Sequence, residues 1–522
     1  MVPDLTRRNA IAAGLGFASL ARSARAAQPA PSPVAATAHG RVRGYVDDGI
    51  LAFRGVRYGA DTGPRRFQPP ASPAPWRHIA DATAYGPASP QRGRADEPRS
   101  EDCLFLNVWT PALTGARPVM VYLHGGAYSS GSGSAALYDG VRLCKRGDVV
   151  VVTVNHRLNA FGYAYLARLL PDLADSGNAG QLDLILALQW VRANIANFGG
   201  DPAKVMVFGQ SGGGAKIATL MAQPAAASLF HCAATMSGQQ VTASGPGNAH
   251  RRILVFLEVL RLKPEQAGDL RTLPAERLVE GLAAEDPVLG FGGLYFGPVL
   301  DERSLKRHPF YPDAPAQSAA IPMIIGNTRD ETRAFLGGDP TNFTVDWAGL
   351  PAKLTQANMR VDIDPDTVIA EYRRLYPAYT PSDVLFAATT AARSWRAAII
   401  EAEERAKAGT PAWVYQFDYP ANGERLRAGH ASDIQMVFDN LDKPGATARG
   451  SQAQQMADQM SEAFIAFART GDPNCAAIPR WEPYDLKRRQ TMVFNTPSAL
   501  AEDPRGAERK LFERVPFVQA GT

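Results

Sequence analysis

A single serine surrounded by glycines is the first candidate for chemistry in this sequence. Ser211 lies in the stretch 207–217, "VFGQSGGGAKI", with Gly209 two positions before it and three glycines directly after it. Glycine is used where the chain turns sharply or where two backbones approach closely, so the pattern favours a crowded turn around this hydroxyl. A serine exposed in such a turn is suited to act as the nucleophile of covalent catalysis.

The flanking residues strengthen this interpretation. An apolar, strand-like run precedes Ser211 and a helix-like run follows it, so G-x-S-x-G here matches the nucleophile elbow, which presents the hydroxyl at a helix N-terminus. The alternatives are a glycine-rich phosphate loop and an ordinary turn. A Walker-type phosphate loop is excluded, because no Gly-Lys-Ser/Thr ends the motif.

A second motif could supply hydrogen-bond donors to the reacting carbonyl. The stretch 122–133, "YLHGGAYSSGSG", follows an apolar run and resembles the H-G-G-G oxyanion loop. We expect the backbone N–H groups of Gly126 and Ala127, with that of Gly212, to form an oxyanion hole. A merely flexible loop is the alternative.

The elements that must position these residues alternate along the chain. Residues 34–59 show short alternating runs split by "DDG", which predicts a small N-terminal antiparallel hairpin. Apolar runs predict strands within 118–126, 148–158, 204–210, 321–327 and 411–419, and helical periodicity covers 182–198. Strands alternating with helices predict an α/β fold, with a mostly parallel central sheet flanked by helices.

A family resemblance covers roughly residues 35 to 495. The matching pieces, in the family's order, are "FRGVRYG", "RRFQPP", "GPASPQ", "SEDCLFLNVWTP", "VMVYLHGGAYSSGSG", "VNHRLNAFGY", "GNAGQLDLILALQWVRANIANFGGDP", "VFGQSGGG", "FGPVLD", "IIGNTRDET", "GHASDIQMVF" and "FARTGDPN". The chain thus resembles the type-B carboxylesterases, which include the cholinesterases. The resemblance implies one α/β-hydrolase domain over 35–519 and a serine hydrolase of small to medium carboxylic esters. No metal or organic cofactor is implied.

The resemblance also places an acid and a base. The D-E pair in "IIGNTRDET" places the acid at Glu331, with Asp330 as the less favoured neighbour, and "GHASDI" places the base at His430. The fold requires the order Ser, acid, His, and His430 is the one histidine of eight that follows the acid. The expected catalytic residues are therefore Ser211, Glu331 and His430.

Other matching positions are interpreted as structural. Glu101, Asp102 and Arg157 match members of ion networks that support the catalytic loops, and His124 is read as scaffolding. Ser237 either hydrogen-bonds near the catalytic acid or caps a helix. Three aromatic residues either line a substrate gorge or belong to the hydrophobic core, which is the commoner case: Tyr128, Phe296 and Phe438.

The sequence departs from the family pattern at three places. Gln210 replaces the glutamate that commonly precedes the nucleophile, which should weaken attraction for cations. Ser89 stands where the family has the disulfide partner of Cys103. The loop 92–99, "RGRADEPR", lacks the choline-binding tryptophan, so a cationic quaternary ammonium site is missing its main element.

The N-terminus predicts export. Arg7 and Arg8 precede a short apolar run and the small-residue site around Ala26 and Ala27, which is typical of a twin-arginine signal over 1–26, followed by a proline-rich linker over 27–34. An uncleaved amphipathic N-terminus is the alternative. The expected location is periplasmic or secreted. The apolar run is too short to span a bilayer, so no integral membrane segment remains after cleavage.

Composition narrows the remaining classes. The net charge of +4 on 522 residues is small, and the sequence has no basic run with interleaved aromatic residues, so a nucleic-acid partner is not expected. The four cysteines are scattered, which favours free buried thiols. The partner expected is a small-molecule ester. A carbamate, amide or lactone on the same site and a cholinesterase-like binding protein are the alternatives. The sequence leaves the natural substrate and oligomeric state open.

Overall fold

The computed structural model describes residues 32–93, 97–290 and 292–519. From Pro33 onward these residues form one compact unit. The predicted signal at 1–26 and residues 27–31 of the predicted linker lie outside the described residues, so both stay predictions. In the described part of the chain, no helix is long and apolar enough to cross a membrane.

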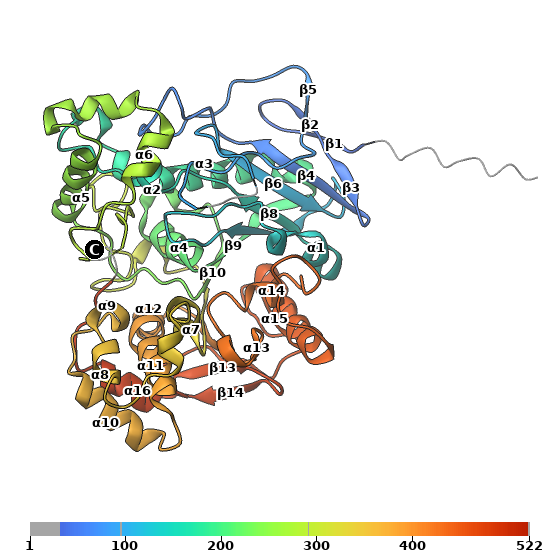
Figure 1. The fold of residues 1–522 in the computed structure, drawn as a ribbon. Helices are drawn as coiled ribbons and strands as arrows, with labels where there is room; N and C mark the ends of the chain where they lie inside the picture. Colours follow the sequence, from blue (N-terminus) through green and yellow to red (C-terminus); the bar gives the residue numbers. More distant parts are fainter. Residues whose placement is uncertain (1–31, 94–96, 291, 520–522) are drawn as a thin grey trace, which may run out of the picture. The chain divides into compact units, whose positions relative to one another are not determined.

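A large mixed sheet of eleven strands organises this unit (Figure 1), in the order β14-β13-β12-β11-β10-β9-β7-β8-β6-β4-β3. The central run from β8 to β13 is parallel, and antiparallel strands border it on both sides. The strands are β3 (Tyr45–Asp47), β4 (Ile50–Arg57), β6 (Phe105–Thr110), β7 (Arg117–Leu123), β8 (Val150–Val154), β9 (Gly200–Gln210), β10 (Cys232–Met236), β11 (Met323–Thr328), β12 (Ala412–Phe417), β13 (Gln490–Phe494) and β14 (Ala499–Glu502).

The central strands are apolar on both faces because both faces are covered. Alternate residues of one strand belong to different cores: Val207 faces one hydrophobic cluster, whereas Met206 and Phe208 face the other. The first cluster is closed by α3, α4 and α12, and the second by α1, α14 and α15. This two-sided burial explains the near-continuous apolar runs in the sequence.

The helices of the described residues vary from one turn to twenty residues. They are α1 (Val141–Gly147), α2 (Asn159–Tyr163), α3 (Ala179–Asn194), α4 (Gly212–Ala222), α5 (Pro246–Val259), α6 (Ala275–Gly281), α7 (Glu331–Leu336), α8 (Leu350–Lys353), α9 (Gln356–Met359), α10 (Pro365–Leu375), α11 (Pro381–Thr390), α12 (Arg396–Lys407), α13 (Gly423–Leu426), α14 (Ile434–Val437), α15 (Ser451–Thr470) and α16 (Gly506–Phe512). A π-helical turn, Ala391–Trp395, joins α11 to α12.

The N-terminal region contains the predicted hairpin and one further pairing. Strands β3 and β4 form an antiparallel hairpin whose turn residues, Asp48 and Gly49, both have positive φ (46° and 82°), as a tight two-residue turn requires. Ahead of it, β1 (Val34–Ala36) and β2 (Arg41–Arg43) pair antiparallel in a separate small sheet, which β5 (Ile79–Asp81) joins in parallel. The predicted α/β fold with a mostly parallel sheet is confirmed.

Candidate active site

Ser211 lies at the sharp turn between β9 and α4, as its glycine pattern predicts. Its backbone has φ 56° and ψ −127°, a region that costs energy for any residue with a side chain. Its N–H donates to the carbonyl of Met236 on β10 at 2.7 Å, which fixes the turn to the sheet. A methyl group on Gly213 would come within 1.9 Å of the Leu123 carbonyl oxygen, so the close approach of helix and strand requires glycine there.

The three predicted oxyanion donors lie around this turn. Gly126 and Ala127 have positive φ (82° and 52°), and a methyl group on Gly212 would meet the Ala127 carbonyl oxygen at 2.1 Å, so the loop rests directly on the start of α4. Within the described residues, the backbone N–H groups of these three residues donate no hydrogen bond. Unsatisfied donors gathered at a helix N-terminus are well placed to hold a negative oxygen.

A buried lysine ties the oxyanion loop to α4. Lys216 is completely buried, and its ammonium group donates to the carbonyl oxygen of His124 at 2.9 Å. Burial lowers the pKa of Lys216 to about 7. Burial also holds the pKa of His124 well below its usual range, and this ring stacks on His156 at 5.0 Å between centroids. His124 therefore supports the loop, in agreement with its interpretation as scaffolding.

Glu331 and His430, 99 residues apart in the chain, form a direct hydrogen bond between Oε2 and Nδ1. Glu331 is fully buried as the first residue of α7, and its other oxygen accepts from the Thr328 N–H at 2.9 Å. Burial, the largest single influence, would raise the pKa of this carboxyl, but His430 together with Ser237 and the Thr328 N–H outweighs it, and the pKa is lowered. The imidazole also packs on the ring of Phe335, with 4.5 Å between centroids.

The neighbours of this pair have other roles. Asp330 pairs with Arg333 at 3.2 Å, whereas Glu331 bonds to His430, so the two members of the D-E pair have different partners. Ser237 caps no helix, because it directly follows β10 and the next helix begins at Pro246. Its hydroxyl instead lies close enough to Glu331 to help lower that pKa, without the geometry of a well-formed hydrogen bond.

Gln210 contacts the opposite nitrogen of the imidazole. Its amide nitrogen lies 3.2 Å from His430 Nε2. Because Nδ1 donates to the Glu331 carboxylate, Nε2 is the acceptor, and the Gln210 amide donates to it. No hydrogen bond joins Ser211 and His430 within the described residues. Contacts between nucleophile and base often tighten when substrate binds, and Ser211 would then replace Gln210 at this nitrogen.

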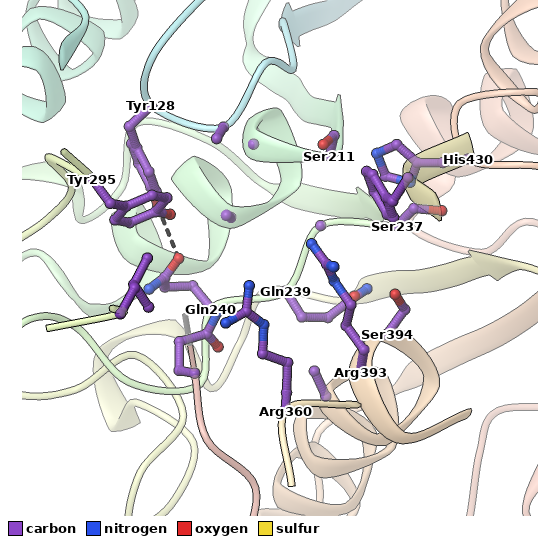
Figure 2. Close-up of a pocket in the computed structure, with 18 of the residues that line it drawn as sticks. Tyr128, Ser211, Ser237, Gln239, Gln240, Tyr295, Arg360, Arg393, Ser394 and His430 are labelled. Atoms are coloured by element: carbon purple, nitrogen blue, oxygen red, sulfur yellow. Dashed lines mark hydrogen bonds between the residues drawn. The ribbon is translucent and has the colours of Figure 1, made fainter. Parts of the chain in front are cut away.

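Ser211 and His430 open into one cavity of about 370 Å³. Figure 2 shows both side chains at one end of it, with the oxyanion loop beside them and two arginines reaching in from the other side. Tyr128 lines the cavity and donates to the Gln240 side chain at 3.1 Å. Phe296 and Phe438 belong to hydrophobic clusters and are core residues.

The predicted ion pairs hold the surrounding loops. Arg57 binds Asp102 through two bonds of 2.6 and 2.7 Å. Arg157 binds Asp183 at 2.6 Å with both side chains buried. Glu101 likewise pairs with an arginine, at 2.7 Å from Arg66 Nε. The four cysteines are free, three of them buried, as predicted from their spacing.

The cavity contains residues that the sequence analysis does not single out. Arg393 lies in the π-helical turn and Arg360 follows α9, and both line the cavity with Gln239 and Ser394. A signal for Arg393 exists in retrospect, since it is one of two charges in the otherwise uncharged stretch 384–400. Arg360 belongs to no motif that could have indicated it.

Comparisons with known proteins agree with this geometry. The model of the carboxylesterase family matches residues 31–512. The para-nitrobenzyl esterase of Bacillus subtilis is 35% identical over 503 residues, with 92% of this chain and 98% of that protein covered. The phenmedipham hydrolase of Pseudarthrobacter oxydans is 32% identical, with 91% and 96% covered.

The fold agrees as well. A crystal structure of the Geobacillus stearothermophilus carboxylesterase EST55 superimposes with a TM-score of 0.82 at 35% identity, covering 92% of this chain and 99% of that one. Its α/β-hydrolase fold corresponds to the large sheet described above. Motif, fold and family match coincide over nearly the whole chain. The protein belongs to the carboxylesterase family of serine ester hydrolases.

Proposed function

We propose that Ser211, His430 and Glu331 hydrolyse small to medium carboxylic esters by two-step acyl transfer. The observation that supports this most strongly is the buried Glu331–His430 hydrogen bond beside a serine in the strained elbow conformation. Ser211 and His430 line one cavity, and Glu331 lies buried behind the imidazole, an arrangement that a structural role for any one of them would not require.

The first step forms the acyl-enzyme. His430 Nε2 takes the Ser211 proton while Oγ bonds to the ester carbonyl carbon, and the oxygen that becomes negative accepts from the N–H groups of Gly126, Ala127 and Gly212. The carbon–oxygen bond to the alcohol then breaks, and His430 returns the proton to the leaving alkoxide. Glu331 holds the ring orientation and stabilises the imidazolium.

The second step reverses these roles with water. His430 takes a proton from water, the hydroxide bonds to the acyl carbon, and the bond to Ser211 Oγ breaks as the proton returns to that oxygen. An acid is released and the enzyme regains its starting state. Each oxyanion donor typically lowers the barrier by roughly 3 kcal/mol.

The test is the variant Ser211→Ala. We expect it to abolish hydrolysis of 4-nitrophenyl acetate with an unchanged melting temperature, because alanine at this φ is no more strained than serine. The matched control, Ser451→Ala, removes an exposed hydroxyl at the start of α15 and should keep full activity. Undiminished turnover by Ser211→Ala would refute the assignment.

We also propose that the protein is exported through the twin-arginine route to the periplasm or beyond. The order of arginine pair, apolar run and small-residue site supports this. Replacing Arg7 and Arg8 by lysines should keep the esterase activity inside the cell. Cell fractionation measures this, and a variant found outside the cytoplasm to the same extent as the wild type would contradict the proposal.

A further inference from the structure

Two arginines project into the cavity from one side. Arg393 lies in the π-helical turn Ala391–Trp395, an irregularity that often occurs at functional sites because it redirects side chains. Arg360 ends α9 in the left-handed conformation, with φ 61°. Figure 2 shows both guanidinium groups pointing into the space below Ser211 and His430.

Arg393 has donors to spare. Its guanidinium carbon lies 4.5 Å from the centre of the Phe335 ring, and within the described residues the group makes no ion pair and no hydrogen bond. Burial, with a smaller contribution from Arg360, lowers the pKa of Arg393 to about 10, so the group remains charged at neutral pH. An arginine presents five N–H donors in a planar fork that matches a carboxylate.

The described acids offset little of the charge on Arg393, because Glu331 acts on it more weakly than Arg360 does. The residues described as lining the cavity include neither aspartate nor glutamate. Glu331 is engaged by His430. Burial raises the pKa of Glu401 to about 8, so this carboxyl is mostly uncharged at neutral pH. The wall opposite Ser211 is therefore cationic, and the unpaired guanidinium of Arg393 favours an anionic ligand.

We infer that the site takes esters whose non-reacting part carries a carboxylate, which Arg393 and Arg360 bind while Ser211 attacks the ester carbonyl. This inference rests on the proposed function and names its substrate class. Gln210 agrees with it, because a carboxylate at that position, next to the cavity-lining His430, would repel such an anion. The two arginines lie across the cavity from the nucleophile, so the carboxylate is held away from the reacting carbon (Figure 2).

The experiment compares esters that differ by one charge. The mono-4-nitrophenyl ester of adipic acid and 4-nitrophenyl hexanoate share a chain length and leaving group, and differ in a terminal carboxylate against a methyl. A second pair, 4-acetoxybenzoate and 4-methylphenyl acetate, places the charge on the alcohol side. We expect kcat/KM of the wild-type protein to be higher for the anionic member of at least one pair.

Substitution identifies the group responsible. Arg393→Gln should reduce the anionic-to-neutral ratio of kcat/KM roughly tenfold or more, the value of a hydrogen-bonded charge. Arg192→Gln, which removes an exposed arginine on α3, should leave the ratio unchanged. Free adipate should also inhibit hydrolysis of the hexanoate ester by the wild-type protein more strongly than 1,6-hexanediol does, which tests the inference without any variant.

The outcomes separate the two proposals. Preference for the neutral member of both pairs, or a ratio that Arg393→Gln does not change, overturns the carboxylate inference and leaves the esterase intact. Adipate inhibition no stronger than that of the diol also overturns it. Failure of the folded wild-type protein to hydrolyse any of the four esters refutes the proposed function instead.

Discussion

Replacing Glu331 by glutamine tests how the imidazole of His430 is activated. The change keeps the volume of a fully buried side chain and removes its charge. The Glu331 carboxylate accepts the Nδ1–H of His430, so an amide there either turns its NH2 toward the ring and imposes the wrong tautomer, or accepts the bond with a neutral oxygen. In both cases the imidazolium formed during acyl transfer loses its counter-charge.

The expected fall in kcat follows from the contact between Glu331 and His430. Two unit charges about 4 Å apart interact by about 4 kcal/mol at an effective dielectric constant of about 20. Each 1.4 kcal/mol is about tenfold in rate, so kcat should fall by about a thousandfold. Misplacement of the ring proton would add to this. The fall should appear in kcat more than in KM, because the imidazolium forms after substrate binds.

Asp330 provides the matched control. It is adjacent in sequence, but its carboxylate pairs with Arg333 rather than with His430. Asp330→Asn should keep kcat within about threefold and change the free energy of unfolding by no more than about 1 kcal/mol. Steady-state kinetics on 4-nitrophenyl acetate compare kcat of the two variants, and thermal melts compare their stability. Equal losses in the two variants, or the larger loss in Asp330→Asn, would refute the assignment of the acid.

Three further perturbations follow from the same contacts. Gln210→Glu places a carboxylate next to the cavity-lining His430. It should raise kcat/KM for acetylcholine relative to its neutral isostere 3,3-dimethylbutyl acetate about tenfold, and an unchanged ratio in pH-stat assays would contradict this. Gly238→Ala would bring a methyl group within 1.7 Å of the Ser211 carbonyl oxygen, so kcat should fall about a hundredfold. The control Gly247→Ala places a methyl group with nothing within 4 Å, so it should keep kcat and stabilise α5 by up to about 1 kcal/mol. Wild-type turnover by Gly238→Ala would contradict the packing described. Glu401 holds its proton in the folded state up to pH about 8 but loses it near pH 4.5 when unfolded, so its contribution to stability is complete below pH 4.5 and is lost as pH rises to 8. The wild-type protein should therefore lose a few kcal/mol more of its unfolding free energy between pH 5 and pH 8 than Glu401→Gln does. Denaturant melts that give the same pH dependence for the wild type and the variant would contradict this prediction.

Local signals predict the central elements well. The run before Ser211 and the glycines after it predict β9, the turn and α4, because strand, turn and helix each leave a pattern in adjacent residues. The helix predicted over 182–198 begins three residues earlier, at Ala179, and its last turn is a 3-10 helix, Ile195–Phe198. Gly199, which follows it, has the positive φ of a helix terminator.

Other elements leave no such local pattern. The strand β10, "CAATM", is short and rich in small residues, so it is recognised as a strand only when β9 and β11 flank it. The same limit applies to the cavity. The Gln210–His430 contact joins residues 220 positions apart, and the convergence of Arg360 and Arg393 depends on how α9 and the π-helical turn pack. Spacing in one sequence carries no information on such contacts.

The family resemblance supplied what spacing could not. It placed Glu331 and His430 from short motifs, and the structure brings these two side chains into direct contact. It could not indicate the contents of the substrate cavity, because this chain departs from the family pattern at Gln210 and in the loop 92–99. Substrate preference is therefore an inference from the arrangement of charges.

The most direct measurement of the central claim is covalent labelling with a fluorophosphonate, followed by peptide mass spectrometry. The account predicts one adduct per chain on the peptide that contains Ser211, slowed about a thousandfold in Glu331→Gln and absent in Ser211→Ala. Stoichiometric labelling of a different serine, with turnover lost in parallel, would contradict it.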